Sequence, residues 1–147
     1  MDYMDDICTL VSRCRNLESL GLKGTQYCNL ESLVWRTKNG LKSLYIHRVR
    51  TPSSILLALL SPSTGISESS STSRIVSVEL SDVDLHGSTW STIFDHLGSS
   101  PLLAYVDVKD ISIERSDKRS VFNMINKVNS REVYLGEDLQ DLYRESL

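Results

Sequence analysis

A spacing of aliphatic residues recurs along the chain and limits the folds that it can form. The stretch CRNLESLGL begins at Cys14, and CNLESLVW repeats its centre from Cys28. In each copy an aliphatic residue is followed by a second one three positions later and by a third apolar residue two positions after that. Five triplets have this spacing, and Val133 with Leu135 forms a weaker sixth copy: Leu17/Leu20/Leu22, Leu30/Leu33/Trp35, Leu41/Leu44/Ile46, Ile75/Val78/Leu80 and Leu103/Val106/Val108. Because alternate residues of a strand point to one side, each copy predicts a short strand with its aliphatic side chains in a narrow core.

Helical patterns lie between most of the predicted strands. Several of them place apolar residues at positions i, i+3, i+4 and i+7, which is typical of an amphipathic helix. The predicted helices cover residues 7–14, 53–60, 90–97, 121–128 and 137–146. Strands that alternate with helices favour a parallel sheet. The links between the first three strands are too short for a helix, so a hairpin at Asn39 and Gly40 is the alternative there.

The length and composition predict one domain over residues 1–147. Residues 61–74, SPSTGISESSSTSR, are rich in serine and predict a flexible loop inside that domain. The net charge is only -3, and no apolar run is long enough to cross a bilayer, so neither nucleic acid nor a membrane is an expected partner. The three cysteines lack zinc-ligand spacing, and their odd number favours free thiols in the cytoplasm or nucleus.

Motifs for catalysis are missing from the sequence. It contains no GxSxG turn for a serine nucleophile, no phosphate-binding glycine loop and no HExxH zinc pair. His86 and His96 are ten residues apart, which is not a ligand spacing on one helix or strand. We therefore expect a protein that is not an enzyme and that has no catalytic residue, metal or cofactor.

Two groups of segments carry a family resemblance. They are CRNLESLGLKG with GLKSLYIHRV, and IVSVELSDVDLHGSTWSTIFDHLGSSPLLAYVDV, in which a strand, a polar turn, a tryptophan-bearing helix and a proline with leucines follow one another. These segments resemble a leucine-rich-repeat protein of the F-box-associated type common in fungi. The resemblance implies an α/β leucine-rich-repeat-like solenoid. Its parallel sheet of about five or six short strands would lie on the concave side, with helices and loops on the convex side.

The same resemblance implies a function. Such repeats often form the substrate-recognition region of an F-box type ubiquitin-ligase adaptor, so a protein-protein interaction scaffold is expected. The resemblance covers the repeat portion alone, because the sequence shows no F-box pattern, so we expect either a fragment of a longer adaptor or a free-standing repeat domain. A stand-alone leucine-rich-repeat interaction domain without a link to a ligase is therefore the alternative. We expect a chain that is monomeric or part of a larger protein, and the identity of its protein partner is open.

The positions between the core residues of each strand would face the open side of the sheet. Aligning the copies places Tyr134 beside Asp107 in the middle row. Tyrosines offer large and rigid contact areas, and basic residues lie in the next row. The predicted partner-binding face consists of Lys23, Arg36, Tyr45, His47, Glu79, Asp107, Lys109 and Tyr134. A less favoured alternative is a nucleic-acid-binding surface at residues 36–50, where basic and aromatic residues are mixed.

Overall fold

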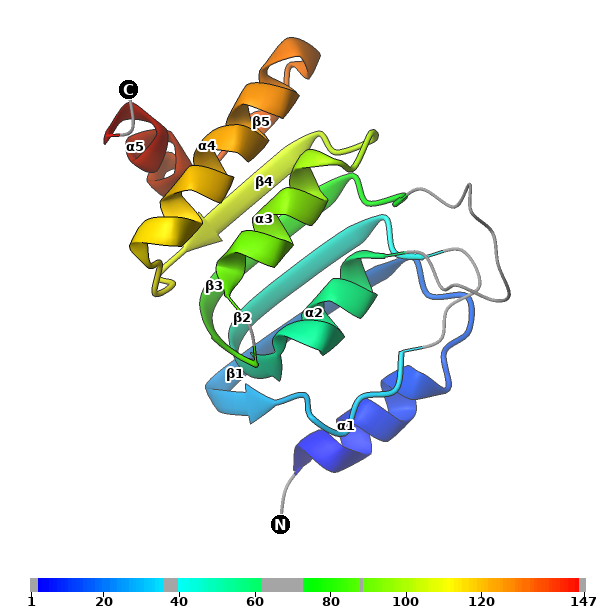
Figure 1. Ribbon diagram of the computed structural model, residues 1–147. Coiled ribbons are helices and arrows are strands. Elements are labelled where there is room, and N and C mark those ends of the chain that lie inside the picture. Colours follow the sequence, from blue (N-terminus) through cyan, green and yellow to red (C-terminus); the bar gives the residue numbers. More distant parts are fainter. Residues whose placement is uncertain (1–2, 36–39, 62–72, 88, 146–147) are drawn as a thin grey trace.

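Five parallel strands form one sheet, and their order in the sheet is their order in the chain (Figure 1). The computed structural model describes residues 3–35, 40–61, 73–87 and 89–145. The strands are β1 (Ser19–Asn29), β2 (Ser43–Pro52), β3 (Ser77–His86), β4 (Tyr105–Lys109) and β5 (Tyr134–Leu135). The α/β class and the parallel sheet are thus confirmed, and β1 and β2 do not form the alternative hairpin.

The register of the sheet follows the aliphatic spacing. Leu20, Leu44, Val78, Val106 and Leu135 lie side by side on successive strands. The first four of them are buried, and so are Ile46, Leu80 and Val108 two positions further along. Because side chains alternate along a strand, this period of two places all of these residues on the same face of the sheet.

Helices cover this face and leave the other one open (Figure 1). They are α2 (Ser53–Leu60), α3 (Trp90–Gly98) and α4 (Arg115–Val128), while α5 (Glu137–Glu145) packs against α4 and β4. The predicted stripes of α3 and α4 are buried, including Phe94 and Ile125. The core therefore lies between one face of the sheet and a single layer of helices.

The predicted strand at Leu30–Trp35 is wrong. β1 continues to Asn29, and the chain then turns at Glu31 and Ser32. The side-chain oxygen of Asn29 accepts a hydrogen bond from the Glu31 amide at 2.9 Å, which stabilises this turn. Leu30 and Leu33 are nevertheless buried. Their burial explains the leucine spacing, but the pairing of β1 with β2 ends at Asn29, and the Leu30 amide donates the last hydrogen bond to β2, to the Arg50 carbonyl at 3.0 Å.

The first helix, α1 (Tyr3–Ser12), differs from its predicted stripe. Cys8 and Val11 are buried, whereas Ile7 and Leu10 are exposed. The helix contacts the turn after β1, because the Ser12 hydroxyl accepts a hydrogen bond from the Val34 amide at 3.1 Å. One side of α1, with Cys8 and Val11, thus packs against the rest of the protein, while Ile7 and Leu10 remain exposed to solvent.

The predicted serine-rich loop over residues 61–74 lies largely outside the described residues. At its end, Ser73 is buried and donates a hydrogen bond to the Leu60 carbonyl at 2.7 Å. None of the helices in the described part of the chain is both long and apolar enough to cross a membrane.

Candidate functional site

Three rows of side chains cross the face of the sheet that the helices leave uncovered, and we call this surface the open face. The strand register defines the rows. They are Ser19/Ser43/Ser77/Tyr105/Tyr134, then Gly21/Tyr45/Glu79/Asp107, then Lys23/His47/Ser81/Lys109. The structure therefore brings seven of the eight predicted site residues onto one surface, and Arg36 lies outside the described residues.

The predicted position of Tyr134 in these rows is wrong. Tyr134 pairs with Tyr105, two positions from the predicted neighbour Asp107. The sixth copy of the spacing lacks its first aliphatic residue, so the alignment matched Val133 to Val106. The structure instead pairs Leu135 with Val106. Gly136 then follows beside the carboxylate of Asp107.

The corrected register creates an aromatic pair on the open face. The rings of Tyr105 and Tyr134 are stacked, with centroids 4.8 Å apart and planes at 11°. Tyr134 is 53% exposed, whereas Tyr105 is half-buried beneath it. Burial and, secondly, the negative charges of Glu79 and Asp107 raise the pKa of Tyr105. Its hydroxyl therefore stays protonated at neutral pH and can donate a hydrogen bond.

Charged groups of both signs lie next to this pair. Asp107 is only 5% exposed, and its Oδ1 has no hydrogen-bond partner among the described residues. Its Oδ2 is 3.4 Å from the ammonium of Lys109. Hydrogen bonding and charge from Asp107 raise the pKa of Lys109, and Glu79 adds to this effect. The open face thus combines a half-exposed cation, two carboxylates and an aromatic pair.

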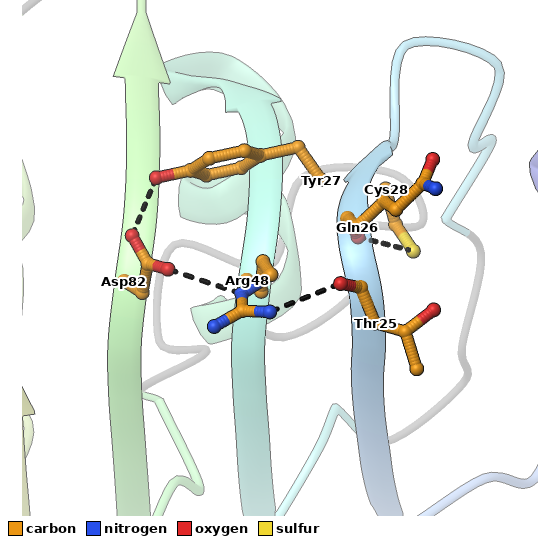
Figure 2. A network of polar contacts seen from close by, with 6 residues as sticks. All are labelled: Thr25, Gln26, Tyr27, Cys28, Arg48 and Asp82. Atoms are coloured by element: carbon orange, nitrogen blue, oxygen red, sulfur yellow. Dashed lines mark hydrogen bonds and ion pairs between the residues drawn. The ribbon is translucent and has the colours of Figure 1, made fainter.

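A second polar cluster, which the sequence interpretation missed, lies toward the carboxyl ends of β1, β2 and β3. Figure 2 shows Tyr27 reaching from β1 across β2 to Asp82 on β3, where its hydroxyl donates to Oδ1. Arg48 lies between them, with its Nε 3.3 Å from Asp82 Oδ2 and its Nη1 donating to the Thr25 carbonyl at 3.0 Å. The hydrogen bond from Tyr27, together with Arg48, lowers the pKa of Asp82. This cluster ties three strands together.

A related ion pair lies one step further along the same strands. Arg50 and Asp84 are 2.9 Å apart, and the Arg50 guanidinium lies 5.7 Å from the centre of the Tyr27 ring. A signal for these pairs was present in the sequence, because RVR on one strand and DVD on the next carry opposite charges at matching positions. Cross-strand pairs of opposite charge stabilise a sheet modestly.

These pairs also bear on the basic stretch at residues 36–50. Arg48 and Arg50 face carboxylates on β3, and the Lys42 ammonium lies 3.5 Å from Glu18. Three of its cations are thus neutralised within the protein. Phosphate binding would have to compete with these carboxylates, so the geometry gives no support to the nucleic-acid alternative.

Left-handed backbone recurs at one level of the sheet. Arg48, Asp82 and Asp110 have φ angles of 59°, 53° and 52°. Each of them follows a residue of the third row, since His47, Ser81 and Lys109 are register partners. Residues other than glycine adopt positive φ uncommonly, so three at equivalent positions mark a repeated local structure.

The three cysteines are free thiols. Within the described residues, no group of three histidine, cysteine, aspartate or glutamate side chains is arranged to hold a metal ion. Comparison with protein-family models, with curated proteins and with solved structures finds no match. The case for a function therefore depends on the geometry of the open face.

Proposed function

We propose that this chain is a protein-binding module that recognises a partner protein through its open face. The observation that carries the proposal is the stacked pair of Tyr105 and Tyr134 on a sheet face that no described helix covers. Tyrosine is enriched among the residues that dominate binding energy, because a rigid ring buries much area and its hydroxyl can still form a hydrogen bond. The half-buried Tyr105 holds Tyr134 in place before binding, which reduces the entropy lost on association.

The charges around the tyrosines support a protein as the partner. Glu79 can pair with a basic side chain of a partner and the exposed Lys23 with an acidic one, while Lys109 is already paired with the buried Asp107 at 3.4 Å. Both signs within one small surface are suited to recognising a specific pattern of charges. A surface for nucleic acid would instead be dominated by unpaired cations.

The repeat class is part of the proposal. The sequential order of five parallel strands and the left-handed residues at one level of β2, β3 and the end of β4 support a leucine-rich-repeat-like solenoid. We propose that its open sheet face is the concave recognition surface of such a solenoid. Free thiols support a reducing compartment, the cytoplasm or nucleus, as its location.

The specific role that we propose is substrate recognition within an F-box type ubiquitin-ligase adaptor. The sequence resemblance supports this role, and a stand-alone interaction domain is the alternative. Deletion of the natural gene separates the two. A protein captured through the open face should lose its ubiquitin modification in the deletion strain if the adaptor role is correct, and unchanged modification would leave the stand-alone domain.

Binding through the open face is tested with a matched pair of variants. Tyr45→Ala with Tyr134→Ala removes two tyrosines from the open face, while Leu10→Ala removes an exposed apolar side chain from α1. Proteins captured from cell extract by the unmodified chain are quantified by mass spectrometry. We expect specific partners to be retained by Leu10→Ala and lost by the double variant, with both variants still unfolding in one cooperative transition. Retention by the double variant would refute the open face as the binding surface.

A further inference from the structure

A groove with an apolar floor lies at the carboxyl end of β4, between α4 and α5. Its volume is about 380 Å³, which is within the usual range for ligand pockets. The floor consists of Val108, Ile111, Ile113, Leu139 and Leu142. Val108 and Leu139 belong to the buried core, while Ile111 and Ile113 are only partly covered. The groove is thus a place where core side chains come close to the surface.

The rim of this groove is acidic. Asp110, Asp138, Asp141 and Glu145 line it, and Lys118 is the one cation among its lining residues in the described chain. Asp141 is 3.3 Å from Arg144 on the same helix. The other three acidic residues of the rim are exposed and have no ion-pair partner within the described residues: Asp110, Asp138 and Glu145. The rim therefore carries carboxylates that are available to a cation from outside.

The negative surface continues past the groove. A second cavity of about 480 Å³ shares Asp110 and Ile113 with the first, and it adds the exposed Glu114 to the lining, together with Asp84, whose charge is paired with Arg50. The connection between β4 and α4 thus lies between two acidic hollows. No lysine or arginine lines the second cavity in the described chain. An extended ligand could follow this surface over both hollows.

We propose that the groove binds a basic segment of a partner protein that carries an apolar side chain between arginines or lysines. The apolar side chain would lie on Ile111, Ile113 and Leu142, and the flanking cations would pair with the rim carboxylates. Charge complementarity of this kind selects the partner and speeds association, while the apolar contact supplies affinity. An acidic rim repels nucleic acid, so a polypeptide is the occupant that the charge favours.

This groove is distinct from the open face. Val108 points toward the helices, whereas its neighbours Asp107 and Lys109 belong to the open face. The two surfaces therefore lie on opposite sides of β4, and the proposal does not depend on what the open face binds. A partner that contacts both would gain avidity from their fixed separation.

The test uses the whole chain and a fluorescein-labelled peptide of sequence GRKLLRKG. Binding is followed by fluorescence anisotropy at low salt and at about 0.15 M salt, where screening shortens electrostatic range to about 8 Å. The variant combines Asp110→Asn, Asp138→Asn and Glu145→Gln, and asparagine tolerates the positive φ of residue 110. We expect binding to weaken about tenfold in this variant, because three charge contacts are lost.

Controls separate the proposal from simpler explanations. The peptide GRKSSRKG should bind about tenfold more weakly than the leucine peptide, because its side chains cannot use the apolar floor. Tyr134→Ala should bind the leucine peptide like the parent. Equal binding of both peptides, unchanged binding by the triple variant, or loss of binding in Tyr134→Ala would each overturn the proposal. Complete displacement of the peptide by spermidine at equal charge concentration would identify a small-cation site instead and would also overturn it. A circular-dichroism melt checks that each variant is folded.

Discussion

The two copies of the pentapeptide NLESL, at residues 16–20 and 29–33, have different structures. In the first copy, Ser19 and Leu20 begin β1. In the second, Leu30 follows the last residue of β1 and the chain turns at once. Yet the last leucine of each copy is buried to the same degree, with Leu20 7% and Leu33 6% exposed. The leucine spacing therefore specifies burial, and it does not by itself specify a strand.

Hydrogen-bond partners account for the difference between the copies. The Glu18 carbonyl in the first copy accepts hydrogen bonds from the Lys42 and Ser43 amides at 2.7 and 3.1 Å, which aligns β1 with β2. In the second copy, Asn29 is the last residue of β1 that pairs with β2. The Leu33 amide then bonds back to the Leu30 carbonyl at 3.0 Å. A strand forms only where a neighbouring strand is present to satisfy its backbone groups.

The largest predicted effect tests whether the burial of a leucine alone determines how much it contributes to the free energy of unfolding. Leu44 in β2 and Leu30 in the second copy are each 1% exposed. We expect Leu44→Ala and Leu30→Ala to lower the free energy of unfolding by similar amounts, about 2 to 5 kcal/mol each, through lost transfer energy and a cavity. Urea denaturation followed by circular dichroism measures both. A loss under about 1 kcal/mol for Leu30→Ala alone would show that the turn after β1 relaxes around the cavity, so that equal burial in a strand and in a turn does not give equal stabilisation.

A second prediction compares glycines at the two ends of the open face. A Cβ on Gly136 would overlap the carboxylate of Asp107, whereas the nearest atoms to a Cβ on Gly21 belong to Tyr45 at 4.0 Å. We expect Gly136→Ala to cost about 1 to 3 kcal/mol, because the buried carboxylate must move. Gly21→Ala should change stability by less than about 0.5 kcal/mol. Thermal unfolding of both variants checks this, and equal stability would contradict the register found for β5.

The α/β class and the register of four strands were predictable from the sequence for a simple physical reason. Shifting a strand by one residue moves all of its apolar side chains to the wrong face, so the aliphatic pattern sets the register of β1 to β4. The same logic placed Tyr45, Glu79 and Lys109 on one surface correctly. Side-chain alternation thus gives the face of a residue without any knowledge of the helices.

The remaining features depend on contacts that local patterns do not encode. Tyr27 bonds to Asp82, which is 55 residues away, and the β5 register depends on where the chain leaves α4. The acidic groove requires residues of β4, α4 and α5 to meet. The spacing of the second NLESL predicts a strand, but the segment forms a turn because it lies at the end of β1. Long-range packing decides each of these cases.

A smaller effect distinguishes the serines of the two copies. The Ser32 hydroxyl donates to Asp5 on α1 at 2.7 Å, whereas the exposed Ser19 makes no side-chain hydrogen bond within the described residues. We expect Ser32→Ala to lower stability by about 0.5 to 1.5 kcal/mol, because a link between α1 and the turn is lost. Ser19→Ala should stay within about 0.5 kcal/mol of the parent. Chemical denaturation measures both, and equal effects would mean that the link contributes nothing.

The smallest effect concerns Tyr27, whose hydroxyl links β1 to Asp82 on β3. Its hydrogen bond lowers the pKa of Asp82 below the ordinary value of 3.8 and raises the pKa of Tyr27 above 10.0. A lowered carboxyl pKa stabilises the folded state above pH 3.8, and this contribution is lost as the pH falls through the lower, folded value. The raised tyrosine pKa stabilises it below pH 10.0, and that contribution is lost as the pH rises through the raised value.

Tyr27→Phe should therefore reduce the free energy of unfolding most between these two limits, and the difference from the parent should shrink toward acid. The matched control is Tyr143→Phe, because the Tyr143 hydroxyl donates to the uncharged amide of Asn126 at 2.9 Å. Removing that bond should lower stability by a similar amount at every acidic pH, since its partner does not titrate. Denaturation curves from pH 2 to pH 7 provide the comparison. A Tyr27→Phe difference that is constant over this range would show that Asp82 is not stabilised by Tyr27, and that Arg48 alone connects it to the neighbouring strand.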